Sequence, residues 1–196
     1  MDADKSVEMQ EWEKYLLLAS FPNLQYLNVS FLPFFNEYAL VEKTNGKLID
    51  IDISHYNDIA YVMNSQRLIK AIAKHCPKLE SLKTSVKLEN LIDIKEMFIN
   101  CTYLKIMYLH NKNEVNQLIY DELLEILVKF SSKSLCNVTF QNCKFTIEGL
   151  GNFFENWRVR VPITFGYYDY NNNLSKEHKM IFKKYYDEGV IKKFYF

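Results

Sequence analysis

Glycine and proline are scarce in this chain, which contains five glycines and four prolines among its 196 residues. Neither G-x-G-x-x-G nor G-x-x-x-x-G-K occurs, and these are the loops that cradle nucleotide phosphates at a helix N-terminus. The sequence therefore gives no indication of nucleotide binding, and we expect no cofactor.

An excess of positive charge is also missing. The 24 lysines and arginines equal the 24 aspartates and glutamates in number, so the formal charge is zero. A dedicated nucleic-acid binder needs basic side chains to neutralise phosphates. Lysines do recur between Lys176 and Lys193 among Phe and Tyr, but Glu177, Asp187 and Glu188 interrupt them. We attribute these lysines to the polar face of a helix and expect no nucleic-acid partner.

The start of the chain has no long apolar stretch. Its longest apolar run, Tyr15 to Ala19, is too short to span a membrane, and no basic region precedes it as in a signal peptide. The charged residues that precede the run are mostly acids: Asp2, Asp4, Glu8, Glu11 and Glu13. We expect no membrane partner and a cytoplasmic or nuclear location.

The four cysteines, Cys76, Cys101, Cys136 and Cys143, form no C-x-x-C pair. This argues against a structural zinc site and, without a secretory signal, against a disulfide framework. Their positions within the repeat described below indicate packing roles rather than reactive thiols. We expect all four to be reduced and most of them to be buried.

Candidate catalytic and metal-binding groups are sparse as well. None of the histidines has a partner at the spacing of a metal-ligand set or a catalytic triad; they are His55, His75, His110 and His178. Asp50 and Asp52 share one strand face near His55 and Asp58, which would suit a divalent cation, but an acidic surface patch is the favoured interpretation. We predict no catalytic residue, no metal and no enzymatic activity.

Aromatic side chains, by contrast, are abundant. The chain has fourteen Phe and fourteen Tyr, and 48% of its residues are hydrophobic. A chain of this composition buries enough apolar surface to fold, and its length suits one sizeable domain.

One stretch matches the leucine-rich-repeat pattern L-x-x-L-x-L-x-x-N/C-x-L, with Leu135, Val138, Phe140, Cys143 and Phe145 at its fixed positions. Alternation around Val138 and Phe140 predicts a short strand with one buried face. The small Cys143 fits under the backbone turn that leaves the strand.

The same unit recurs along the chain. The predicted strands open at Leu24, Leu48, Leu79, Leu104, Leu135, Arg160 and Ile191. The spacings are 24, 31, 25, 31, 25 and 31 residues, so two slightly different repeats alternate. Before Leu24, Leu79, Leu104 and Leu135, the third preceding residue is Phe, Cys, Cys and Ser, which predicts a small or buried side chain there.

Apolar residues at helical spacing lie between most of these strands and predict helices at 66–75, 91–100, 119–130, 147–157 and 175–188, the last ended by Gly189. The segment 31–47 is irregular, and Pro162 marks the strand at 161–165 as the least regular. The predicted fold is an α/β leucine-rich-repeat solenoid, with a curved parallel sheet of about seven strands on the concave side and helices outside. A doubly wound sheet is the alternative, but it has no reason to keep a constant double repeat.

The predicted domain organisation is simple. Residues 1–20 form an N-terminal helix, mainly over 7–20, that caps or continues the repeats, and residues 21–196 form the repeat domain.

The residues that alternate with the buried ones form the predicted concave face. They are Tyr26, Asn28, Ser30, Asp50, Asp52, Ser54, Ser81, Lys83, Ser85, Ile106, Tyr108, His110, Asn137, Thr139, Gln141, Thr164 and Tyr195. This is a mixed polar surface with exposed tyrosines, a composition typical of a protein-recognition face rather than a catalytic pocket.

Four phrases carry a family resemblance: Ile72-Ala-Lys-His-Cys-Pro-Lys-Leu-Glu-Ser-Leu82, Asp121-Glu-Leu-Leu-Glu-Ile-Leu-Val-Lys-Phe-Ser131, Phe153-Phe-Glu-Asn-Trp157 and Tyr185-Tyr-Asp-Glu-Gly-Val-Ile-Lys192. They resemble the repeat region of divergent fungal F-box proteins, over roughly residues 20–196. In that family an N-terminal F-box docks on the adaptor of a cullin ubiquitin ligase, and the repeats select the substrate. Residues 1–20 are too short for an F-box and carry no L-P-x-E-type opening.

The resemblance therefore implies the substrate-recognition part alone. We expect a non-catalytic protein-interaction module that holds a protein client on its concave face in ubiquitin-dependent degradation. The ligase adaptor is expected as a partner only if an F-box lies upstream. The alternative is a free leucine-rich-repeat scaffold or inhibitor with no ubiquitin role.

Overall fold

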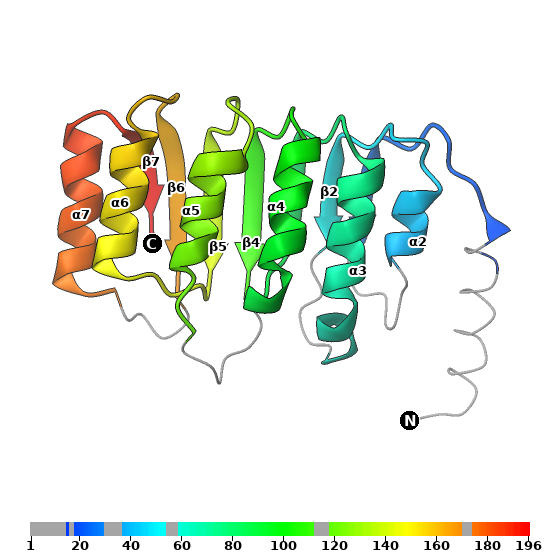
Figure 1. The fold of residues 1–196 in the computed structure, drawn as a ribbon, viewed down its shortest axis with the longest axis horizontal. Coiled ribbons are helices and arrows are strands. Elements are labelled where there is room, and N and C mark those ends of the chain that lie inside the picture. Colours follow the sequence, from blue (N-terminus) through cyan, green and yellow to red (C-terminus); the bar gives the residue numbers. More distant parts are fainter. Residues whose placement is uncertain (1–14, 16–17, 30–36, 54–58, 112–117, 170–173) are drawn as a thin grey trace.

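The computed structural model describes residues 15, 18–29, 37–53, 59–111, 118–169 and 174–196, and the side chains of 59–64 are excluded. Strands and helices alternate along the described chain (Figure 1). The elements are β1 (Tyr26–Val29), α2 (Glu37–Glu42), β2 (Asp50–Ile53), α3 (Ile59–His75), β3 (Ser81–Ser85), the 3-10 helix η1 (Leu88–Asn90), α4 (Leu91–Asn100), β4 (Ile106–His110), α5 (Asp121–Phe130), β5 (Asn137–Gln141), α6 (Ile147–Trp157), β6 (Ile163–Tyr168), α7 (Lys176–Asp187) and β7 (Ile191–Tyr195).

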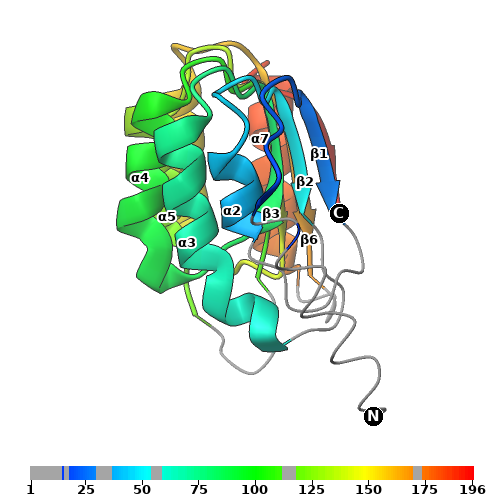
Figure 2. The ribbon, with the colours of Figure 1, turned by 90° about the vertical axis from the view of Figure 1, so that its right-hand side faces the viewer.

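The seven strands form one sheet, in which each strand pairs in parallel with the next one along the chain. The helices stand in a row on one face of this sheet, and no described helix covers the other face (Figure 2). The α/β class and the seven parallel strands are therefore confirmed. The doubly wound alternative is wrong, because such a sheet reverses its strand order and carries helices on both faces.

The strands form where apolar and polar residues alternate, because successive side chains point to opposite faces of a sheet. In β2, Ile51 and Ile53 are fully buried, whereas Asp50 and Asp52 are half-buried on the other face. The strand openers and the apolar residues that alternate along the strands are expected in the core on the same grounds, and six of them are buried there: Leu79, Leu82, Leu104, Met107, Val138 and Phe140.

The helices bury one stripe each and have recognisable ends. In α5, Leu123 and Leu127 are buried. Thr146 caps the N-terminus of α6, where its hydroxyl accepts a hydrogen bond from the Gly149 amide at 2.9 Å. Gly189 ends α7 with φ of 75°, and the amides of Gly189 and Val190 donate to the Tyr186 and Tyr185 carbonyls. This is a Schellman motif, so the predicted glycine cap is confirmed.

The core changes character along the sheet. Towards β2 and β3 it is aliphatic, but towards β6 it is aromatic. The ring centroid of Phe165 on β6 lies within 6 Å of four others, at 5.6 Å from Phe140, 5.8 Å from Phe153, 5.1 Å from Phe154 and 5.6 Å from Phe182. Consecutive units are thus joined by interlocking side chains rather than by a few isolated contacts.

One sequence prediction about the elements is wrong, and another gives a helix that is too short. The segment 31–47 contains a helix, α2, whose Tyr38 ring lies 5.8 Å from the Arg67 guanidinium of α3. A helix this short is stabilised by packing rather than by its own sequence, which explains why no pattern predicted it. The helix predicted at 66–75 begins earlier, at Ile59.

Arg160 does not open a strand. Aligning Arg160 with Leu135 would place Pro162 opposite Asn137, but Asn137 pairs with Thr164 instead. The strand therefore begins two residues later than predicted. Asn137, Thr164 and Lys193 lie opposite one another on β5, β6 and β7, so these strands are spaced by 27 and 29 residues along the chain. The strand openers had predicted spacings of 25 and 31 residues. A register shift at Ile163 and Thr164 against β7 confirms that this strand is irregular.

The predicted N-terminal helix lies mostly outside the described residues. Within it, the Ala19 amide donates to the Tyr15 carbonyl at 3.0 Å. In the described part of the chain, no helix combines the length and the apolar composition needed to cross a bilayer.

Candidate protein-binding face

The face of the sheet opposite the helices, called the open face below, collects the residues that alternate with the core. Register arranges them in rows that cross the strands. The first row is Tyr26, Asp50, Ser81, Ile106, Asn137, Thr164 and Lys193. The second row is Asn28, Asp52, Lys83, Tyr108, Thr139, Gly166 and Tyr195. The third row is Ser85, His110, Gln141 and Tyr168.

The structure therefore brings the predicted face residues together, apart from Ser30 and Ser54, which lie outside the described residues. Sequence reasoning missed Gly166, Tyr168 and Lys193. Continuing the alternation from Thr164 would have found the first two. Lys192 and Lys193 had been assigned to the polar face of a helix, but they belong to strand β7.

Exposure varies along the face. Tyr26 is 66% exposed and Ile106 is 46% exposed, whereas His110 and Thr139 retain 8% and 9%. Gly166 explains part of this, because a Cβ there would lie 2.7 Å from the Thr139 hydroxyl oxygen. Thr139 thus lies on the open face, but it contributes little accessible surface.

Polar and aromatic contacts connect the middle strands. The Lys83 ammonium lies 3.4 Å from the Asp52 Oδ2 and 5.3 Å from the centre of the Tyr108 ring. The Tyr108 hydroxyl donates a hydrogen bond to the Gln141 Oε1. These contacts link β2 to β5 and hold the Tyr108 ring in one orientation, so an incoming partner does not have to order it.

The C-terminal part of the face is aromatic and basic. Tyr168 and Tyr195 stack with ring centroids 6.5 Å apart and planes 11° apart. The Lys193 ammonium lies 5.0 Å from the centre of the Tyr195 ring, a cation–π geometry.

The acidic part lies on β2. Asp52 Oδ1 is buried and accepts no hydrogen bond from any described group. Within the described residues, no group of three His, Cys, Asp or Glu side chains is arranged to hold a metal ion. His55 and Asp58, which were considered as further ligands, lie outside the described residues.

Three of the four cysteines are buried, and Cys136 is exposed. Burial raises the pKa of the Cys76 and Cys101 thiols to about 12. Burial also raises the pKa of Cys143. The Cys101 thiol donates to the Cys76 carbonyl at 3.3 Å. Because a thiolate is the reactive form, these environments suit packing rather than nucleophilic chemistry.

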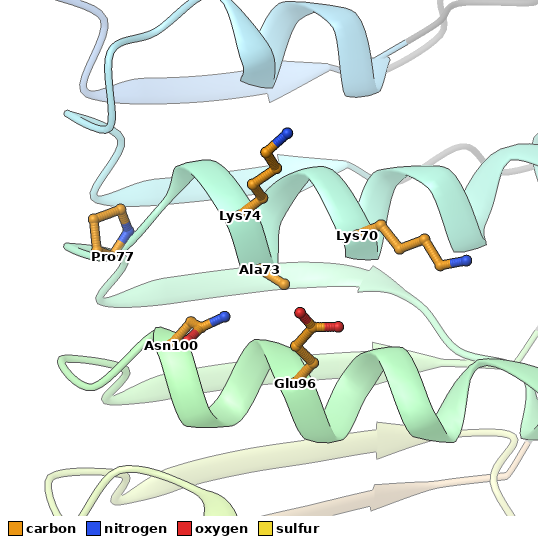
Figure 3. A pocket seen from close by; sticks show the side chains of 6 residues that line it. All are labelled: Lys70, Ala73, Lys74, Pro77, Glu96 and Asn100. Carbon is orange, nitrogen blue, oxygen red and sulfur yellow. The ribbon is translucent and has the colours of Figure 1, made fainter.

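The helical face has shallow hollows between neighbouring helices. One, of about 560 Å³, lies between α3 and α4 (Figure 3) and is lined by Lys70, Ala73, Lys74, Pro77, Glu96 and Asn100. Its lining combines the cationic Lys70 and Lys74 with the acidic Glu96 and holds no His, Cys, Ser or Thr. A similar hollow between α5 and α6 has the buried side chains of Leu124 and Phe153 in its lining.

No protein-family model matches the chain, and no curated protein matches its sequence.

Proposed function

We propose that this chain is a leucine-rich-repeat solenoid that binds a protein client on its open face without catalysing a reaction. The repeat motif around Val138, the sequential parallel strand order and the single row of helices support the solenoid. In such folds each unit buries its apolar face against its neighbours, and the opposite face of the sheet is left for binding.

The open face is the observation that carries the proposal. Tyr26, Tyr108, Tyr168 and Tyr195 distribute aromatic surface from one edge of the sheet to the other. Tyrosine is enriched at interface hot spots, because its ring offers contact area at a low cost in side-chain entropy. The polar side chains between these rings can pair with a client's backbone and polar groups.

The distribution of titratable groups on this face favours binding over catalysis. Asp52 and Lys83 neutralise each other, and Asp50, His110 and Lys193 are on separate strands. General acid–base chemistry needs such groups within hydrogen-bond reach of one reacting site.

The family resemblance supports a more specific role. We propose that the client is a substrate selected for ubiquitin-dependent degradation by an F-box-type ligase, in the cytoplasm or the nucleus. The alternative is a free scaffold or inhibitor that binds its client through the same face with no ligase. The upstream genomic sequence distinguishes them, because an in-frame F-box supports the ligase role and a stop codon supports the free scaffold.

The face itself is tested by comparing tagged variants in cells that produce the protein. Proteins retained by the wild-type chain are quantified by mass spectrometry beside those retained by Tyr26→Ala, Tyr108→Ala and Lys129→Ala. We expect both tyrosine variants to weaken client binding by about 1 kcal/mol or more, which is roughly fivefold. Lys129, on α5, is exposed on the helical side and serves as the matched control.

Urea unfolding of each variant separates lost contact from lost structure. The proposal fails if Lys129→Ala abolishes retention while the folded tyrosine variants keep every partner.

A further inference from the structure

We infer that the open face binds an extended segment of the client that crosses the strands, with a basic residue at Asp50 and an acidic residue at Lys193. This inference rests on the proposed function, because it assigns the client's chemistry at the same face. The inference specifies which end of the client segment is basic and which is acidic.

Asp50 and Lys193 occupy the same row. Register connects Asp50 to Ser81, Ile106, Asn137, Thr164 and finally Lys193. The side chains between the two charges are short or uncharged. A chain laid along this row meets an anion near one end and a cation at the other. Between them it meets the polar Ser81, Asn137 and Thr164 and the apolar Ile106.

Neither charge is neutralised within the described part of the protein. The Asp50 carboxylate has no ion pair or hydrogen bond there, whereas its neighbour Asp52 is paired with Lys83. Lys193 contacts the Tyr195 ring but no acidic group. Two unpaired opposite charges on one row therefore set a polarity that the ligand has to match.

Asp52 adds little charge at the β2 end, because it is paired with Lys83. Its Oδ1 is buried without a hydrogen-bond donor, although Lys83 lies 3.4 Å from its Oδ2. Asp50 is therefore the carboxylate available to a ligand there, and an arginine presents several N–H donors in a planar fork that matches it.

The row also fixes the spacing of the ligand's charges. From β2 to β7 the row crosses neighbouring strands about 4.8 Å apart, so its ends are about 24 Å apart. An extended chain advances about 3.4 Å per residue, so the ligand's basic and acidic residues lie about seven positions apart. The larger side chains of Lys83 and Tyr108 in the second row flank this path on one side.

Random twelve-residue peptides displayed on phage are the probe, and the full chain is the target. We expect enriched peptides to carry Arg or Lys about seven positions from Asp or Glu. A synthetic copy of one enriched peptide is then titrated by fluorescence anisotropy against the wild-type chain, Asp50→Lys, Lys193→Glu and the double variant. Each single variant is expected to bind about tenfold more weakly, and a peptide with its two charges exchanged is expected to recover affinity for the double variant.

The controls separate this inference from the proposed function. If enriched peptides lose affinity for Tyr108→Ala but show no charge pattern, and the charge variants bind them normally, the open face binds ligands and the inference is overturned. The inference and the proposed function are both overturned if no peptide is enriched. They are also both overturned if Tyr108→Ala and the charge variants bind normally while Lys129→Ala abolishes binding, because the open face is then not the binding surface. Circular dichroism and urea midpoints equal to wild type are required of each variant scored.

Discussion

Arg160 is the residue whose role differs most from its sequence pattern. Its guanidinium donates to the Leu127 carbonyl at 3.2 Å and to the Ser131 carbonyl at 3.1 Å, and it also donates to the Ser132 carbonyl. It lies 4.0 Å from the centre of the Trp157 ring. These carbonyls end helix α5, where the helix dipole favours a positive charge. Arg160 thus joins the end of one unit to the start of the next.

We expect Arg160→Ala to lower the free energy of unfolding by about 2–3 kcal/mol, because several carbonyl groups lose a charged donor at once. Arg160→Lys keeps the charge but loses the planar fork, so it is expected to recover less than half of this loss. Urea unfolding followed by circular dichroism measures both. A lysine variant as stable as wild type would show that charge alone is required.

Leu104 and Lys83 test the assignment of sheet faces. Leu104 is fully buried, so we expect Leu104→Ala to cost about 2–5 kcal/mol through lost apolar contacts and a cavity. Lys83 lies on the open face in a partly exposed ion pair, so Lys83→Ala is expected to cost about 0.5 kcal/mol or less. Equal shifts of the urea midpoint would contradict the register.

At the scale of elements, charged groups connect α6 and α7 on the outer face. Arg158 reaches the carboxylates of Glu155 and Glu188, and the Tyr185 hydroxyl donates to Glu155 at 2.9 Å. Hydrogen bonds from Arg158 and Tyr185 lower the pKa of Glu155 to about 2. The network lies on the surface, where solvent screens it.

This network predicts a defined pH dependence. A carboxyl whose pKa is lower in the folded state than its ordinary value of 4.5 stabilises the fold above that value, and the contribution is lost as pH falls through about 2. The urea midpoint of Glu155→Gln should therefore lie below that of wild type near neutral pH, and the two should converge as pH approaches about 2. Glu96→Gln, on α4 and without an ion pair among the described residues, is the control and should show no comparable convergence. A pH-independent gap for Glu155→Gln would rule out this linkage.

At the scale of the whole molecule, each strand of the described sheet pairs with the strands that precede and follow it along the chain. The open face is therefore continuous across the strands, and under the proposed function a client contacts several strands at once. The proposed ligase role requires a separate adaptor-binding element, and the F-box motif of the proteins that the sequence resembles is not recognisable in residues 1–20.

We therefore expect the chain of residues 1–196 not to retain the cullin-ligase adaptor in a pull-down with purified adaptor. A fusion of an adaptor-binding F-box to its N-terminus is expected to retain it and serves as the positive control. Retention by the unfused chain would mean that the repeats themselves contact the adaptor.

The sequence by itself determined the sheet and its two faces. Alternation is a local property, because successive side chains along a strand point to opposite faces of the sheet. Residues such as Ile51, Met107 and Val138 could therefore be assigned to the core, and Tyr108 and Asn137 to the open face, from their positions alone. The recurring spacing then placed the strands in one parallel sheet, because a crossover helix fits between successive strands.

Only the tertiary structure decided which distant residues meet. The register shift at Ile163 and Thr164 places Lys193 on the row of Asp50, and the path of the chain after α6 brings Arg160 to the carbonyls of α5. Helix α2 is likewise stabilised by packing on α3. These contacts depend on the lengths of individual helices and on one irregular strand pairing, and neither can be read from the average spacing of the repeats. The sequence pattern therefore determined which face each residue lies on, and tertiary packing determined which residues it contacts.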